Sequence, residues 1–328
     1  MKKALPVIIL ILAVIIVVFV ATGIVNKGEK DTRRIIAIVL PRAESCFCES
    51  FRRGASGACE ATGFKIRMIE SSGRGQGELQ SRLSGALQTQ GACGVILAGL
   101  EGRVPGILAE QVSKERVPCV IVGTRDDVYG QPYKARCCVG PDEYISGLIA
   151  ARRMAEILSD KGRLAILNCG RESPLTAKRE NGFVHTIRND FGGIQIVETK
   201  HGPGDVEGAF LAAERLLTEH PDIGGLFACD QTASLGALQA LEKDPRAGKI
   251  KVVGFGVQGA LVEALGSGII DSLVVRNGCG MGREAVGAVI AAINGEEIPG
   301  HIDIKVVVVT RENLDDPEIQ ELTAAARE

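Results

Sequence analysis

The sequence predicts an α/β protein of two lobes, each built on a parallel sheet with helices on both faces. Short apolar segments rich in β-branched residues alternate with segments of helical periodicity along most of the chain, as at 35–40 and 77–90. Repeated units of this kind form parallel sheets. The strands are too many for one open sheet, and 328 residues are enough for about two domains.

The elements of the first lobe follow from short apolar runs and from leucines spaced four apart, as in 79, 83 and 87. We expect strands at 35–40, 65–69, 94–97 and 119–122, and helices at 50–61, 77–90 and 104–115. The stretch 129–141 contains two glycines and two prolines, which makes it the nearest thing to a linker.

The same alternation restarts in the second half of the chain. We expect strands at 164–167, 194–199, 225–228, 251–255, 272–275 and 302–309. We expect helices at 142–158, 176–191, 206–219, 232–241, 259–265, 281–293 and 317–327.

Composition excludes several classes of protein. The chain has a formal net charge of −2 and no basic block, so it lacks the clustered cations that nucleic-acid binding needs. Ten cysteines in a chain of this length do not indicate a small disulfide scaffold.

The N-terminal segment has the pattern of an export signal. Lys2 and Lys3 precede an almost wholly apolar run from Leu5 to Val25, which is 21 residues long. A bilayer needs about 20 such residues, so residues 1–25 form either a cleaved signal peptide or a retained membrane anchor. The small residues at 21–23 would allow cleavage. In both cases the rest of the chain is expected to be extracytoplasmic.

One glycine motif is a decoy for a dinucleotide site. Gly254–Gly259 matches G-x-G-x-x-G after a strand, but the acidic residue expected about 20 positions later, after a second strand, is missing. In open α/β sheets, the residues that bind a ligand directly follow the carboxyl ends of the strands. We therefore expect no cofactor and look for a ligand site at those ends.

Several short motifs occur in one order across the chain. They are Ile35–Leu40 followed by Phe47, Pro118–Gly123, Arg179–Phe183 (RENGF), His220–Ala228 with Leu235–Leu241, Val253–Phe255 and Met281–Val286. In order and spacing this set resembles the type I periplasmic sugar-binding proteins, most closely the ribose-binding branch, whose fold also forms the effector half of LacI-type repressors. The resemblance spans about residues 34–312.

This resemblance implies two Rossmann-like lobes joined by a three-segment hinge, a ligand in the cleft between them, and no catalysis. We expect an N-terminal lobe of residues 34–140 plus 276–303, a C-terminal lobe of 141–275 plus 304–312, and a C-terminal helix and tail at 313–328. It also implies a partner, either an ABC-type permease or a membrane receptor. We expect a monomer that binds a small molecule and no nucleic acid.

The expected ligand pocket departs from the family pattern. Gly123 and Gly256 stand where the family usually has aspartates, Asp230 stands for an asparagine, and Arg276 for a glutamine. The early Asn-Pro-Phe-Phe is here Ser45 to Cys48, which keeps Phe47 as a stacking ring. With no tryptophan in the chain, an atypical sugar, polyol or sugar derivative is expected. The candidate contacts are Ser45, Phe47, Arg125, Asp230 and Arg276.

Arginines leave a second ligand class open. Arg42, Arg125 and Arg276 all follow strands, which favours an anionic ligand. Alternatively, Arg42 and Arg125 face solvent while Arg276 pairs with Asp230. A sensory protein that presents such a signal to a membrane receptor is therefore the alternative to a transport component.

The cysteines allow three interpretations. Five of them, Cys46, Cys48, Cys169, Cys229 and Cys279, follow predicted strands. They could form disulfides, remain free thiols, or converge on a soft metal. The four histidines show no spacing that indicates a catalytic triad, so no enzyme is expected.

Overall fold

The computed structural model describes residues 34–41, 46–71, 76–100, 102–123, 134–170 and 173–326. The chain divides into two compact units, Met1–Arg34 and Ile35–Glu328, and everything below concerns the second unit. The predicted signal or anchor at 1–25 lies outside the described residues. Within the described residues, no helix combines the length and the apolar character that crossing a bilayer requires.

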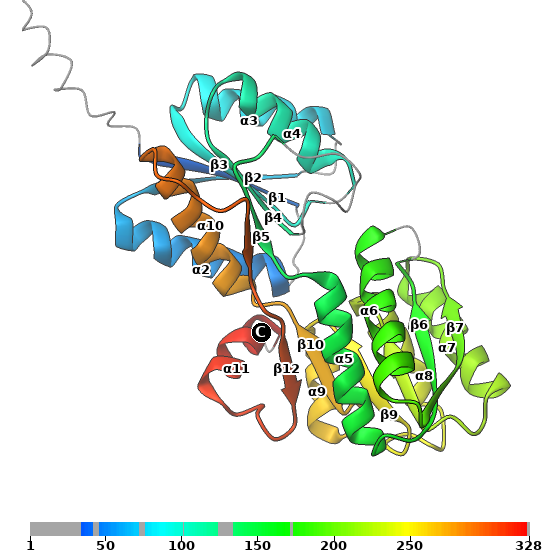
Figure 1. Cartoon of the computed structure of the whole chain (residues 1–328). Coiled ribbons are helices and arrows are strands. Elements are labelled where there is room, and N and C mark those ends of the chain that lie inside the picture. The colour runs from blue at the N-terminus through cyan, green and yellow to red at the C-terminus, as the bar shows by residue number, and fades with distance from the viewer. Residues whose placement is uncertain are drawn as a thin grey trace, which may run out of the picture. The chain divides into compact units, whose positions relative to one another are not determined.

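The first sheet has the strand order β11-β5-β4-β3-β1-β2, and all of its pairs are parallel. Its strands are β1 (Ile35–Leu40), β2 (Lys65–Glu70), β3 (Ala92–Ala98), β4 (Cys119–Val122), β5 (Cys137–Gly140) and β11 (His301–Asp303). Helices α2 (Cys46–Thr62) and α10 (Gly278–Ile293) cover one face, and α3 (Gln76–Gln88) and α4 (Val104–Lys114) cover the other (Figure 1).

The second sheet has the order β12-β10-β9-β8-β6-β7 and is parallel except for the pair of β10 with β12. Its strands are β6 (Gly162–Asn168), β7 (Ile194–His201), β8 (Gly225–Ala228), β9 (Lys251–Phe255), β10 (Ser272–Val275) and β12 (Val307–Thr310). Helices α5 (Glu143–Leu158) and α6 (Pro174–Asp190) cover one face. Helices α7 (Val206–Glu219), α8 (Gln231–Leu241) and α9 (Gly259–Ser267) cover the other.

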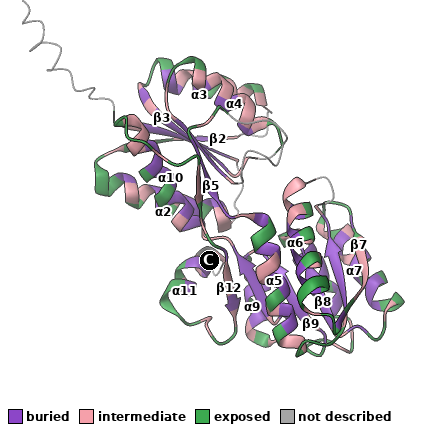
Figure 2. Ribbon diagram, in the orientation of Figure 1, coloured by how far each residue is buried: buried purple, intermediate pink, exposed green. Residues whose placement is uncertain are grey.

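The two sheets share one topology, which places the candidate site. In each sheet the chain order reverses direction at a switch point, between β1 and β3 in the first and between β6 and β8 in the second. Ligands of doubly wound sheets bind beside the carboxyl ends of the strands at such a point. Because the central strands, such as β1, β3 and β8, are buried on both faces, they show continuous apolar runs rather than alternation (Figure 2).

Three segments pass from one sheet to the other. Helix α5 follows β5 of the first sheet and packs on the second, and α10 follows β10 of the second and packs on the first. The third passage separates β11 from β12. Two α/β sheets with three passages agree with the predicted fold class.

The sequence prediction was wrong in two places at these passages. The single strand expected at 302–309 is two short strands, β11 and β12, one in each sheet. The stretch interpreted as a linker contains β5, which is buried between β4 and β11. Three cysteines expected at strand ends, Cys46, Cys48 and Cys279, instead belong to α2 and α10, and the last two are buried.

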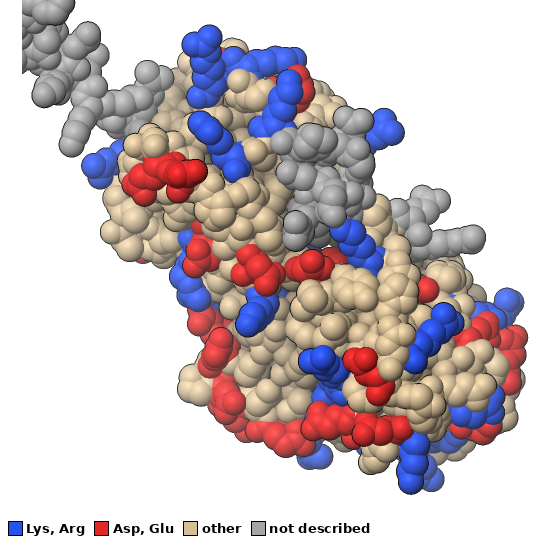
Figure 3. All heavy atoms as spheres, in the orientation of Figure 1, with Lys and Arg blue, Asp and Glu red and all other residues tan. Residues whose placement is uncertain are grey.

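A short C-terminal helix, α11 (Pro317–Thr323), ends the described chain together with a 3₁₀ turn at Ala324–Ala326. Ile319 and Leu322 of α11 join the core on the α7–α9 side of the second sheet. Lysine and arginine side chains are interspersed with acidic ones over the face shown in Figure 3.

Candidate functional site

Two cavities lie at the carboxyl ends of the strands. One, of about 740 Å³, is lined by residues that follow β6, β7, β8, β9 and β10. The other, of about 670 Å³, is lined by residues that follow β1, β3 and β4 together with residues of the second sheet. Leu175, Gln231, Gly256 and Arg276 line both cavities, so the two form one continuous candidate site. Each of the two cavities has the volume of a small-molecule site.

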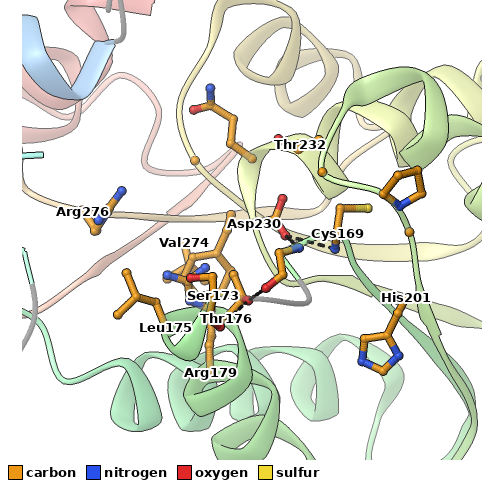
Figure 4. Close-up of a pocket in the computed structure, with 17 residues that line it drawn as sticks. Cys169, Ser173, Leu175, Thr176, Arg179, His201, Asp230, Thr232, Val274 and Arg276 are labelled. Atoms are coloured by element: carbon orange, nitrogen blue, oxygen red, sulfur yellow. Dashed lines mark hydrogen bonds between the residues drawn. The ribbon is translucent and has the colours of Figure 1, made fainter. Parts of the chain in front are cut away.

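Asp230 holds the second-sheet side of this site together. It is the N-cap of α8, and its Oδ1 accepts the N–H of Ala233 at 2.8 Å. Its Oδ2 accepts the N–H groups of Cys169 at 3.2 Å and Gly170 at 3.1 Å, as the dashed lines in Figure 4 show. One carboxylate therefore ties the turn after β6 to the start of α8. It lines the first cavity as well, but its geometry is that of a helix cap.

Arg276 and Phe47, both predicted contacts, come together. The guanidinium carbon of Arg276 lies 5.0 Å from the centroid of the Phe47 ring, within the range of a cation–π contact. Phe47 lies in the first turn of α2, and its ring centroid is 6.2 Å from that of Phe51. Phe51 is fully buried and lies next to Phe47, whose ring in turn contacts the guanidinium of Arg276.

The arginine of the RENGF motif is part of a buried network. Arg179 Nε and Nη2 donate to Glu143 Oε2 at 3.0 and 2.6 Å, and Nη1 donates to the carbonyl oxygen of Cys229. The guanidinium carbon also lies 3.9 Å from the ring centroid of Phe255. Phe255 therefore serves both as core and as cavity wall. Sequence reasoning identified this motif but missed its partner, Glu143, at the start of α5.

A polar cluster forms the far side of the first cavity. His201 Nε2 lies 3.2 Å from Glu180 Oε2, and the same oxygen accepts from Asn168 Nδ2 at 2.6 Å. Asn168 Oδ1 in turn accepts the N–H of Gly170 at 3.0 Å. His201 and Arg276 lie on opposite sides of the cavity in Figure 4.

Gly123 and Gly256, at which the resemblance implied aspartates, both have positive φ. Gly123 has φ +158° and Gly256 has φ +99°. At Gly256 a Cβ atom would meet the side chain of Gln231 at 2.7 Å. Gln231 lies in the stretch that follows β8, but sequence reasoning did not select it as a contact.

The thiols near the site are protected from ionisation. Burial first, and the nearby Asp230 second, raise the pKa of Cys169 to about 12. Burial raises the pKa of Cys229 well above its ordinary value. Since the thiolate is the nucleophile and the metal ligand, these groups are inert at neutral pH. Cys59, Cys119, Cys169, Cys229 and Cys279 are free thiols.

A soft-metal site was one interpretation of the cysteines. Within the described residues, no group of three or more His, Cys, Asp or Glu side chains could hold a metal ion.

Three residues weighed for the ligand site, Arg42, Ser45 and Arg125, lie outside the described residues.

Comparisons with known proteins agree with this fold. The sequence model of the family described as "Periplasmic binding protein domain" matches residues 36–297. The chain therefore belongs to this family of binding proteins, as the resemblance implied, and the family consists of transport solute-binding proteins rather than enzymes.

Two named binding proteins align with most of this chain. The chain is 23% identical to the ABC transporter periplasmic-binding protein YphF of Escherichia coli, over 74% of this chain and 75% of that protein. It is 21% identical to the ribose import binding protein RbsB of Salmonella typhimurium, over 88% of this chain and 94% of that one.

Solved structures share the fold. An ABC transporter solute-binding protein from Agrobacterium vitis, bound to α-D-tagatopyranose, has a TM-score of 0.75 at 23% identity, covering 88% of this chain and 98% of that one. The arabinose-binding protein AraP from Geobacillus stearothermophilus has a TM-score of 0.78 at 21% identity, covering 86% and 98%.

Proposed function

We propose that this protein is an extracytoplasmic solute-binding component that captures a small polyhydroxy compound for an ABC-type importer. The observation that carries the proposal is the continuous pair of cavities at the carboxyl ends of both sheets, lined by polar groups and by the Arg276–Phe47 pair. Relatives described as binders of ribose, apiose, tagatose and arabinose support a sugar, sugar derivative or polyol as the solute.

The proposed contacts are Phe47, Asp230 and Arg276, together with Ser45 and Arg125. An aromatic face beside a guanidinium fits a sugar, since the ring packs on C–H groups while N–H groups reach hydroxyls. Asp230 keeps one acceptor site, on Oδ1, for a hydroxyl in addition to its three backbone N–H donors.

The domain organisation belongs to the same proposal. We assign residues 34–140 plus 276–303 to one lobe, 141–275 plus 304–312 to the other, and 313–328 to a C-terminal helix and tail. We further propose that residues 1–25 are a signal peptide or membrane anchor, and that the exported protein is a monomer.

The alternative is a sensory binding protein that presents an anionic signal to a membrane receptor. Two guanidinium groups, Arg179 and Arg276, and the imidazole of His201 line the first cavity, whereas Asp230 is the one carboxylate among its described lining residues. Such a wall does not repel an acid.

A thermal-shift screen tests the proposal. The panel holds D-ribose, D-arabinose, D-tagatose, D-allose, xylitol and D-galacturonate. A bound solute raises the melting temperature because it stabilises the folded state by RT ln(1 + [L]/Kd). We expect a neutral sugar or polyol to give the largest shift. A shift with D-galacturonate alone would favour the sensory alternative, and no shift with any compound would contradict the proposal.

A further inference from the structure

Gly256, the residue after β9, leaves a space that a neighbouring side chain fills. An ideal Cβ built on Gly256 would lie 2.7 Å from Cβ, 2.8 Å from Cγ and 2.8 Å from Oε1 of Gln231. Real Cβ atoms essentially never approach other atoms this closely. Gln231 in its present position and a side chain at 256 are therefore mutually exclusive.

The backbone at Gly256 reinforces this exclusion. Its φ of +99° is a conformation that residues with a Cβ rarely adopt, and its N–H donates to the carbonyl oxygen of Val274 at 3.1 Å. The turn is therefore fixed to the adjacent strand β10. Any side chain that reaches the cavity wall here must come from another element.

That element is α8. Gln231 is its first residue, directly after the Asp230 cap, and it is exposed. It lines both cavities, as does Arg276. Its amide is thus held by a capped helix at the junction of the candidate site.

The side chain of Gln231 offers a ligand an amide, whereas the aspartate that the resemblance implied at position 256 would offer a carboxylate. A primary amide has two N–H donors and an acceptor oxygen, so one side chain serves both a hydroxyl hydrogen and a hydroxyl oxygen. It is also neutral, so it does not repel an acidic group on the solute.

We propose that Gln231 contacts the bound solute and determines its selectivity, through an amide that occupies the side-chain space of residue 256. This rests on the proposed function, because it assigns a role within the same solute site. The pair Gln231–Gly256 is one unit: the glycine is required for the position of the glutamine.

Calorimetry with D-ribose, D-arabinose, D-tagatose, D-allose, D-galactose and D-galacturonate tests the contact. For a sugar that the wild type binds, Gln231→Ala should raise Kd about tenfold, as expected for a lost hydrogen-bonding pair. Gln231→Glu should weaken an acidic sugar more than a neutral one. The matched control is Gln195→Ala, an exposed glutamine of β7 outside both cavities, which should leave Kd unchanged.

Thermal unfolding without any ligand tests the steric pairing. Gly256→Ala should lower the melting temperature by about 4 °C or more, since it adds both a contact and an unfavourable φ. Gln231→Gly removes the Cβ atom at 2.7 Å as well as Cγ and Oε1, so it should lower the melting temperature less in the Gly256→Ala background than in the wild type.

The outcomes separate the two proposals. Sugar binding by the wild type with an unchanged Kd in Gln231→Ala would overturn the role of Gln231 and leave the proposed function standing. Strictly additive melting shifts would overturn the pairing with Gly256. No binding of any sugar by the wild type would overturn the proposed function and the selectivity role with it.

Discussion

The guanidinium carbon of Arg276 lies 5.0 Å from the centroid of the Phe47 ring, joining the residue after β10 to the first turn of α2. The two residues are 229 positions apart in the sequence, yet each was selected as a ligand contact from its position after a strand. The contact means that the ring face is shared between a cation and whatever the cavity binds. Phe47 is thus a support for Arg276 as well as a stacking surface.

Replacing Arg276 should weaken solute binding. A hydrogen bond to a charged group contributes about 1.5–3 kcal/mol, so Arg276→Ala should raise Kd about 10- to 150-fold. Phe47→Leu keeps the apolar bulk but removes the cation–π contact, so it should raise Kd about two- to fivefold. Calorimetry with the best sugar of the screen measures both. Arg311→Ala, an exposed arginine outside both cavities, is the control, and an Arg276→Ala variant that binds like this control would contradict the assignment.

The buried pair of Glu143 and Arg179 should be essential for stability as a pair. Their side chains are 1% and 6% exposed, so removing one charge leaves the other buried without its partner. Glu143→Gln should lower the free energy of unfolding by about 3–5 kcal/mol. The double variant Glu143→Leu with Arg179→Met should recover much of that loss. Urea titration of the wild type and of both variants measures these differences. A Glu143→Gln variant as stable as the wild type would contradict the stabilising role of the pair.

Both carboxylate oxygens of Asp230 should contribute to the stability of the fold. Asparagine still caps a helix, but its amide nitrogen cannot accept the N–H groups of Cys169 and Gly170 that Oδ2 now accepts. Asp230→Ala should therefore cost about 2 kcal/mol or more in unfolding free energy, and Asp230→Asn should cost less. Chemical denaturation distinguishes them. Equal stability of Asp230→Ala and the wild type would show that the bridge contributes nothing.

The buried thiols should make the fold sensitive to alkali. Burial raises the pKa of Cys119 to about 12, and burial with Asp230 does the same for Cys169, from an ordinary value of 9.0. Because both folded pKa values are raised, their stabilising contribution is complete below pH 9 and is lost as the pH rises toward 12. Unfolding free energies at pH 8 and pH 10.5 should differ less for Cys119→Ala than for the wild type. An identical difference in the two proteins would contradict the protected state of this thiol.

The alternation of strands and helices was predictable because each buried parallel strand is a short β-branched run. Most elements lie within a few residues of their expected bounds, as α7 and β8 do. Periodicity alone did not indicate the passages between the sheets, which only the family resemblance implied. The run 302–309 consists of β-branched residues except for Asp303 and Lys305, and nothing in its periodicity indicates that 301–303 pairs with β5 while 307–310 pairs with β10.

The site was partly predictable because the ends of the buried parallel strands can be located in the sequence. Strand ends identify Asp230 and Arg276, and the stretch after β1 together with the resemblance identifies Phe47. Glu143 and Gln231 were missed because their roles depend on tertiary contacts: one pairs with Arg179 of α6, and the other fills the space above Gly256. Neither contact leaves a local pattern in the sequence.

Calorimetric titration of the purified protein with the neutral sugars D-ribose, D-arabinose, D-tagatose and D-allose is the most direct test of solute binding. One of these sugars should bind with a stoichiometry of about one per chain, as expected for a single continuous site, and Arg276→Ala should weaken it. Saturable binding that is unchanged in Arg276→Ala, or no binding of any of these sugars, would contradict a polyhydroxy solute in this cavity.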